Sequence, residues 1–271
     1  MFRQLIRRPG GAIAVAILVV IAVLALGGPM LAPFDPYEAS FDILLGPNAT
    51  NWLGTDYMGR DVLSRLLHGS SLSVLGAVQV VCIGLLLGVL PGMLSVFCGR
   101  SFEWASLRVV DTLIALPSLV FAVAVTALIG NGVSEAMFVV GVLVTPFFYR
   151  VARAAALEVA GQPYLQASVL MGASVWWLVR QHVWRKAAPA VWIAVATMTG
   201  HSLIVVSSLT FLGIGVQPPE PTWGGLLASD LQYLSQKPYA PVFPSLLIVL
   251  TVAALNLLAD TMRDIQRRGA A

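Results

Sequence analysis

The chain carries very little charge. Lysine, arginine, aspartate and glutamate together make up 11% of its 271 residues, whereas soluble domains average about 25%. Apolar residues reach 58%, and the mean hydropathy is +0.85. This composition excludes an ordinary water-soluble fold and predicts a single polytopic membrane domain.

Lysine and the common catalytic motifs are scarce or missing. The chain has two lysines, Lys186 and Lys237, and neither belongs to a Gly-Lys-Ser/Thr sequence. It is therefore not itself a P-loop ATPase. His68, His182 and His201 are far apart, and the sequence contains no His-Glu-x-x-His or Gly-x-Ser-x-Gly pattern. We expect no catalytic residue, no metal site and no cofactor in this chain.

Cysteine and clustered basic charge are also rare. Cys82 and Cys98 both fall in or at the end of one apolar segment, so they imply no disulfide framework. The net charge is only +3, and the basic residues do not gather on a soluble face. We therefore expect a lipid bilayer, and no nucleic acid, among the partners.

Long apolar runs dominate what is present. A helix needs about 20 apolar residues to cross the hydrocarbon of a bilayer. Six segments are candidates, of which the fourth is the shortest, and together they predict an all-α membrane protein with six transmembrane helices: Gly11–Leu31, Leu72–Phe97, Leu107–Ile129, Glu135–Phe148, Val191–Leu212 and Val242–Leu258. Basic residues before the first run are also typical of a secretory signal peptide, but the run continues to Leu31, which favours a retained helix.

Small residues and prolines predict how these helices pack. Gly84, Gly88 and Gly92 recur every four residues, which places them on one helix face and allows a neighbouring helix to approach closely. Pro91 and Pro117 lie within apolar runs, where we expect them to bend their helices.

The basic residues predict the orientation. If the N-terminus is cytoplasmic, thirteen of the 16 lysines and arginines fall inside, and only Arg60, Arg65 and Lys237 fall outside. This asymmetry follows the positive-inside rule, so both termini are predicted to be cytoplasmic. Residues 32–71 and 213–241 are then extracytoplasmic, and residues 150–189 form a long cytoplasmic loop.

Ionisable residues within the predicted spans are few. Asp111, Glu158 and Asp260 can all reach the interface, where Arg108 and Arg263 are candidate partners for the two aspartates. His201 is the ionisable residue placed well inside a span. Proton-coupled carriers use chains of buried acids and often contain inverted repeats, and we see neither in the sequence. The energy for any transport is therefore expected to come from another polypeptide.

The cytoplasmic loop predicts a helix, a turn and a second helix over residues 162–182. Pro163 suits a helix start, and Gly172 can adopt the positive φ that ends a helix. The first helix presents an apolar face made of Tyr164, Ala167, Val169, Leu170 and Met171, and the second carries Trp176, Trp177, Val179, Arg180 and His182. Two interpretations remain open from these residues: a helix that fits a groove on a protein partner, or one that lies on the bilayer surface.

The loop resembles the EAA signature of the permeases of ABC importers. Ala167 and Gly172 match that pattern, with Ser168 at the second alanine, and Tyr164, His182 and Pro189 fit the form found in peptide importers. The resemblance extends to other segments of the C-type subunit of dipeptide/oligopeptide (peptide/nickel) importers. These segments are Leu53–Arg65, Thr210–Gly224 and Asn256–Asp264.

This resemblance implies a fold and a function. The fold is the type I ABC-importer permease, with an N-terminal segment and first helix (residues 1–31), an extracytoplasmic segment (32–71), a permease core (72–265) and a cytoplasmic tail (266–271). The function is a non-catalytic permease subunit in the bacterial inner membrane that imports dipeptides or oligopeptides. The implied partners are a homologous second permease, two ATPase subunits that bind ATP and Mg²⁺, and an extracytoplasmic peptide-binding protein.

The resemblance also assigns a site. The ATPase-coupling loop would use Tyr164, Ala167, Ser168, Gly172, Ala173, Ser174 and His182, whereas no substrate-binding residue can be named. The turn residues of Leu53–Arg65, with the pair Arg60 and Asp61, suggest a structural cap or a docking surface. Arg185, Lys186 and Val206 depart from the family pattern. Alternatives are a nickel or glutathione permease, an ion-coupled secondary carrier, and a scaffold that binds a cytoplasmic protein.

Overall fold

Helices form the framework of this protein. The computed structural model describes residues 5–129, 132–216 and 218–270, and it contains no strand within these ranges. The helices are α2 (Pro9–Leu31), α3 (Val62–Leu94), α4 (Arg100–Ala115), α5 (Ser118–Ile129), α6 (Val133–Ala160), α7 (Pro163–Leu170), α8 (Val175–Leu178), the π-helical turn η1 (Val179–Val183), α9 (Trp184–Phe211), α10 (Trp223–Gln232) and α11 (Val242–Ala270). The predicted all-α class is confirmed.

Among the described residues, five helices are long and apolar enough to cross a membrane: Pro9–Leu31, Val62–Leu94, Val133–Ala160, Val175–Phe211 and Val242–Arg268. A sixth span is possible if the bent pair α4 and α5 crosses as one unit. The number of apolar segments therefore agrees with the sequence, whereas the shape of the third differs from the predicted continuous helix.

The third predicted span is broken in two. Helices α4 and α5 meet at an angle of 93° instead of forming one helix over residues 107–129. Leu116 ends α4 in an extended conformation, with φ −76° and ψ 133°, directly before Pro117. Proline disfavours the helical conformation of the residue before it and has no N–H to donate, so the helix stops there. Pro91, in contrast, lies inside an uninterrupted α3.

Several helices extend well beyond the predicted spans, among them α11, which continues to Ala270 instead of ending at Leu258. Helix α6 continues to Ala160, and α3 begins at Val62 instead of near Leu72. The extension of α6 is rich in alanine, a strong helix former, and its buried Ala152 and Ala156 pack in the core. Hydropathy misses this part because it carries Arg150, Arg153 and Glu158. The non-helical part of the cytoplasmic loop is correspondingly short.

Close packing of α3 on α6 forms the centre of the bundle. A Cβ added to Gly88 would lie 2.6 Å from the carbonyl oxygen of Thr145, and one added to Gly92 would lie 2.5 Å from that of Tyr149. The two backbones approach this closely only because these positions carry no side chain. The predicted glycine face of α3 is confirmed.

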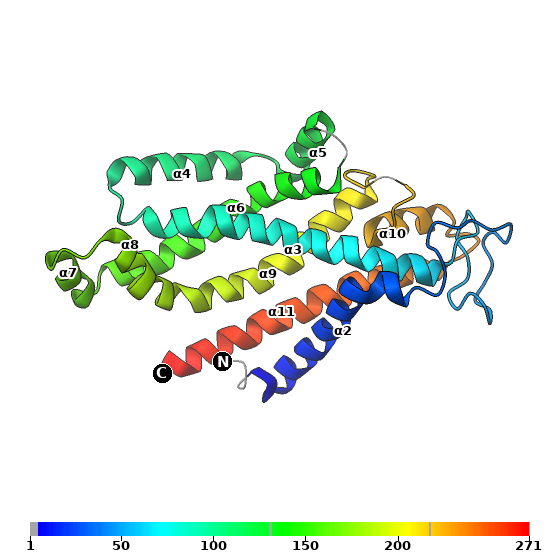
Figure 1. Ribbon diagram of the computed structural model, residues 1–271, viewed down its shortest axis with the longest axis horizontal. Coiled ribbons are helices and arrows are strands. Elements are labelled where there is room, and N and C mark those ends of the chain that lie inside the picture. Colours follow the sequence, from blue (N-terminus) through cyan, green and yellow to red (C-terminus); the bar gives the residue numbers. More distant parts are fainter. Residues whose placement is uncertain (1–4, 130–131, 217, 271) are drawn as a thin grey trace.

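The candidate functional segments lie at opposite ends of the molecule (Figure 1). Helices α7 and α8 lie at one end, toward which the start of α2 and the end of α11 also point. The segment before α3 and helix α10 lie at the other end. The predicted cytoplasmic loop is therefore at the end where both termini were predicted, opposite the predicted outer segments.

Candidate functional site

Helix α7 has a sharply defined start and end. Gln162 precedes it in an extended conformation, and Pro163 takes the first helical position, where a missing N–H costs nothing. At the other end, the N–H of Ala173 donates to the oxygen of Ser168 (3.1 Å), and that of Gly172 donates to Val169 (3.0 Å). This pair of bonds is the Schellman motif.

Gly172 occupies the position of this motif that requires a left-handed backbone. Its φ is +83°, as the sequence predicted. A Cβ at Gly172 would have no atom within 4 Å, so the glycine is required by the backbone conformation and not by crowding within this chain.

The second half of the loop leads directly into a long helix. The hydroxyl of Ser174 accepts a hydrogen bond from the N–H of Trp177 (3.3 Å) and caps α8. Helix α8 then passes through the π-helical turn η1 into α9, which gives a helical stretch from Val175 to Phe211. Single π-helical turns of this kind often occur at functional sites. His182 lies within it.

Two aromatic contacts connect α7 to the π-helical turn. The ring of His182 lies 5.4 Å from that of Tyr164 and 5.2 Å from that of Trp177. Leu165 adds an apolar anchor, since it is 2% exposed and belongs to the core that contains Val183. Displacement of α7 is therefore expected to act on both α6 and the start of α9.

The outward face of α7 is apolar and uncovered. Leu170 is 88% exposed and Met171 is 81% exposed, and Val169 and Tyr164 are about half exposed. Two shallow hollows adjoin this face. One, of about 400 Å³, contains Tyr164 and His182, and the other, of about 490 Å³, contains Ser168, Gly172, Ala173, Ser174 and Trp177.

The predicted coupling residues therefore come together at one end of the protein. Six of the seven line these two hollows, and Ala167 lies exposed on α7. Their proximity was expected from the sequence, but the contacts made by His182 were not.

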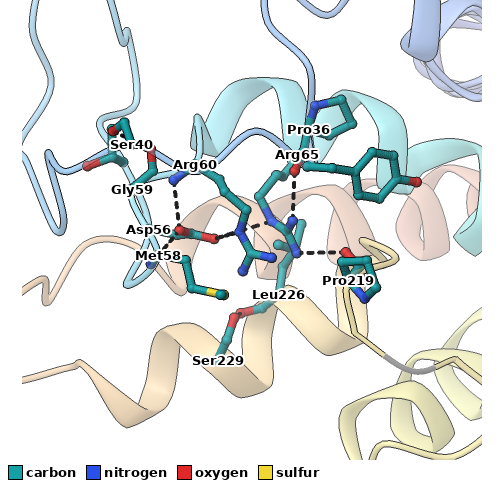
Figure 2. A network of polar contacts seen from close by, with 12 residues as sticks. Pro36, Ser40, Asp56, Met58, Gly59, Arg60, Arg65, Pro219, Leu226 and Ser229 are labelled. Atoms are coloured by element: carbon teal, nitrogen blue, oxygen red, sulfur yellow. Dashed lines mark hydrogen bonds and ion pairs between the residues drawn. The ribbon is translucent and has the colours of Figure 1, made fainter.

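A charged cap forms the opposite end of the molecule. Gly54 and Gly59 both have φ of +78°, and they allow the chain to turn tightly around Asp56. The carboxylate of Asp56 accepts hydrogen bonds from the N–H groups of Met58 (2.8 Å) and Arg60 (3.0 Å) and from Nε of Arg60 (2.8 Å) (Figure 2).

The three basic residues predicted to lie outside are all buried in this cap. Arg65 donates to the carbonyl oxygens of Pro36 (2.8 Å) and Pro219 (3.4 Å), and Lys237 donates to Thr55 (2.6 Å). Each contact joins segments that are far apart in the sequence. Contacts between residues so far apart leave no repeating pattern in the sequence, so the cluster was not predicted.

The expected pair of Arg60 and Asp61 does not form. Arg60 pairs with Asp56, while Asp61 caps α3 by accepting from the N–H of Ser64 (2.8 Å). The reason is that Asp61 is the residue before the first turn of α3, where a carboxylate satisfies a free N–H of the helix. The interpretation of the segment as a structural cap agrees with this geometry.

Helix α10 completes the cap. Trp223 at its start is fully buried, and its backbone N–H donates to the hydroxyl of Ser73 in α3 (2.9 Å). Burial and the nearby Asp56 carboxylate raise the pKa of Asp230, in the same helix, to about 6. Burial lowers the pKa of Lys237.

The ionisable residues of the helices pair near their ends. Asp260 accepts from Arg263 (2.7 Å), as expected, whereas Asp111 pairs with Arg150 (3.8 Å) instead of Arg108. Among the described residues, no group of three or more His, Cys, Asp or Glu side chains could hold a metal ion.

Comparison with known proteins identifies the family. Residues 83–271 match the model of the binding-protein-dependent transport system inner membrane component. Residues 1–47 match that of the N-terminal transmembrane domain of oligopeptide transport permease C.

Individual relatives cover almost the whole chain. The probable D,D-dipeptide transport system permease protein of Escherichia coli (strain K12) is 34% identical over 250 residues, which are 92% of this chain and 84% of the relative. The di/tripeptide transport system permease protein of Pseudomonas aeruginosa is 36% identical, over 91% of this chain and 84% of the relative. The glutathione transport system permease protein of Pectobacterium atrosepticum is 32% identical, over 97% and 88%.

These matches, together with the apolar helices, place the protein in a bacterial inner membrane as a multi-pass protein. Membership of the family also implies an ATPase and a substrate-binding protein as partners. The chain belongs to the family of binding-protein-dependent transport system inner membrane components, the permease subunits of ABC transporters.

Proposed function

We propose that this protein is the permease subunit of an ATP-driven importer of short peptides. Three relatives support this solute class, since their names refer to D,D-dipeptides, di- and tripeptides, and glutathione, which is itself a tripeptide. A nickel solute stays an alternative prediction. The chain would provide one half of the translocation pathway and no catalytic residue.

The exposed apolar face of α7 is the observation that carries the proposal. Exposed apolar side chains such as Leu170 and Met171 are expected to bind a protein groove or a bilayer. The chain itself has no ATP-binding loop, and its family implies a partner ATPase. A protein groove on that ATPase is therefore the better explanation for this surface.

The coupling mechanism follows from how α7 is attached. Leu165 anchors it to the core, and Tyr164 packs on His182 in the π-helical turn before α9. ATP-driven closure of the partner ATPases would move α7, and the movement would tilt α6 and α9 together. This tilt would switch the pathway between inward and outward access.

The remaining partners are part of the same proposal. A homologous second permease would cover the apolar surface of α4 and α5, where Val109, Val120 and Leu128 are more than half exposed. Two ATPase subunits would bind ATP and Mg²⁺ on the cytoplasmic side. A peptide-binding protein would deliver the solute to the charged cap on the outside.

Site-directed labelling tests the orientation and the coupling partner together. We would replace Cys82 and Cys98 with serine and then introduce Met171→Cys in the α7 turn or Phe41→Cys in the outer segment. A membrane-impermeant maleimide added to intact cells should label the cysteine at position 41 and not the one at 171. In permeabilised cells, a short bifunctional crosslinker should join only position 171 to the ATPase.

Three outcomes would contradict the proposal. Labelling of position 171 from outside would place α7 on the wrong side of the membrane. Ion-gradient-driven uptake by vesicles that contain this chain alone would identify a secondary carrier, and loss of the chain with no loss of uptake would identify a scaffold.

A further inference from the structure

A pocket of about 340 Å³ lies in the charged cap, beside α10. Tyr57, Arg60 and Arg65 line one part of it, the end of α9 around Phe211 lines another, and Glu220 and α10 complete it. Its size is within the range of small-molecule sites. The sequence suggests a structural or docking role for Leu53–Arg65, and neither the sequence nor the matched families assign a ligand to this pocket.

Arg60 brings an incompletely bonded positive charge to the pocket. The residue is 3% exposed, and its Cζ lies 5.4 Å from the centre of the Tyr57 ring. Its Nε is bonded to Asp56. Neither terminal nitrogen of its guanidinium donates to any residue in the described ranges, and Figure 2 shows both without a partner.

The two guanidinium groups beside the pocket share one ion-pair partner among the described residues. One carboxylate, that of Asp56, serves two buried guanidinium groups, at 2.8 Å from Arg60 and 3.4 Å from Arg65. Nε of Arg65 has no hydrogen-bond acceptor among the described residues. A buried charge without a full set of partners is costly, and a guanidinium with two free nitrogens is shaped to hold a carboxylate.

A negative charge lies elsewhere on the pocket lining. Glu220 is exposed, and its Oε2 accepts a hydrogen bond from the hydroxyl of Tyr37 (2.8 Å). This bond holds the carboxylate in place and leaves its second oxygen available. The pocket therefore presents a guanidinium and a carboxylate to the same small volume.

We propose that this pocket binds a short zwitterionic peptide, with the peptide carboxylate on Arg60 and its ammonium group toward Glu220. The choice of a peptide among zwitterions rests on the proposed function. The pocket is then an intermediate binding site on the outer side of the pathway, which the peptide occupies after its delivery and before its passage through the bundle.

Direct binding to the purified full chain in lipid nanodiscs tests the proposal without ATP or partner subunits. The probes are Ala-Ala, its C-terminal amide and its N-acetyl derivative. We expect Ala-Ala to bind about tenfold or more tightly than either derivative, because each derivative loses one charge-assisted contact. Equal binding of all three probes, or no binding of Ala-Ala at millimolar concentration, would overturn the proposal.

Charge-changing variants assign the two ends of the peptide. Arg60→Lys should weaken binding of Ala-Ala about tenfold and leave the weak binding of the amide unchanged, since the amide has no carboxylate to lose. Glu220→Gln keeps an acceptor for Tyr37, and it should weaken Ala-Ala but not the N-acetyl derivative. The reverse pattern, or equal effects on every probe, would contradict the assignment.

A filled pocket gives a second test in case Arg60→Lys does not fold. Ala228 lines the pocket from α10, so Ala228→Phe should abolish binding while leaving the pair of Arg60 and Asp56 intact. Leu231, in the same helix, is exposed and does not line the pocket, so Leu231→Phe is the matched control. Unchanged peptide binding in Ala228→Phe would overturn the proposal, as would a loss confined to docking of the peptide-binding protein.

The experiments can contradict the proposed coupling function and the proposed peptide pocket independently of each other. If position 171 crosslinks to the ATPase but Ala-Ala does not bind, only the peptide pocket is wrong. If Ala-Ala binds with the expected pattern but no ATPase contact forms, the coupling function is wrong and the pocket remains.

Discussion

The ring of His182 lies 5.4 Å from the ring of Tyr164, and this contact joins the π-helical turn to α7. A second feature of His182 is less favourable, because its Nε2 is buried without a hydrogen-bond partner among the described residues. The ring contacts of His182 therefore stabilise the fold, whereas its unbonded Nε2 destabilises it. Two substitutions can separate these effects.

His182→Phe should stabilise the protein, and His182→Ala should impair coupling. Phenylalanine keeps the aromatic contacts and removes the unsatisfied nitrogen, which is worth about 1 kcal/mol or more. Alanine loses both ring contacts and frees α7 from the π-helical turn. Thermal unfolding in detergent measures the first effect, and the number of peptides imported per ATP hydrolysed measures the second. Loss of import in His182→Phe would show that the polar nitrogen itself is needed.

Gly172→Leu should abolish import with little loss of stability. The left-handed backbone adds a strain of about 1–2 kcal/mol, and the side chain points into open space in this chain. A large functional loss must then come from a clash with the partner ATPase. Membrane abundance, ATPase association and uptake are the measurements.

Gly99→Leu is the matched control for this variant. Gly99 also has a positive φ, of +87°, and open space around its Cβ position, but it lies in the turn before α4. Its ψ of 168° places it in a region that side chains adopt even less readily, so its strain should be at least as large, and it should retain uptake. Equal loss of uptake in both variants would assign the Gly172 effect to backbone strain alone.

Gly88→Ala should destabilise the bundle, whereas Gly76→Ala in the same helix should not. A Cβ at Gly88 would lie 2.6 Å from the oxygen of Thr145, while one at Gly76 would meet its nearest atom, Sδ of Met137, at 3.4 Å. Overpacking costs about 1–3 kcal/mol, whereas replacing a helical glycine whose Cβ would make only ordinary van der Waals contacts gains up to about 1 kcal/mol. Thermal midpoints of the two variants should therefore move in opposite directions, and equal midpoints would show that α3 and α6 can separate without cost.

The sequence predicted the features that depend on local chemistry. The apolar runs predicted the membrane helices, Gly172 predicted the turn after α7, and the glycines of α3 predicted its contact with α6. Each of these follows from residue type and spacing within one segment.

Features that depend on distant contacts were not predicted. Arg65 reaches the oxygens of Pro36 and Pro219, which are 29 and 154 residues away, and no spacing rule connects such positions. Pro117 predicted a bend, but the size of the angle between α4 and α5, 93°, depends on how these helices pack. The sequence did contain one clue, because charged residues are rare in this chain. The three basic residues predicted to lie outside, Arg60, Arg65 and Lys237, all belong to one buried cluster.

The buried carboxyl group of Asp230 predicts a pH dependence of stability. Its pKa rises from 3.8 to about 6 on folding, so between about pH 4 and pH 6 the folded state binds more protons than the unfolded state. This group's contribution to stability therefore falls as the pH rises through that window, by about 1 kcal/mol after allowance for solvent screening.

Asp230→Asn removes the titration. The thermal midpoint of the variant relative to the parent should consequently increase from pH 4 to pH 7. A difference that stays constant or decreases with pH would show that Asp230 is ionised at no cost in the folded cap.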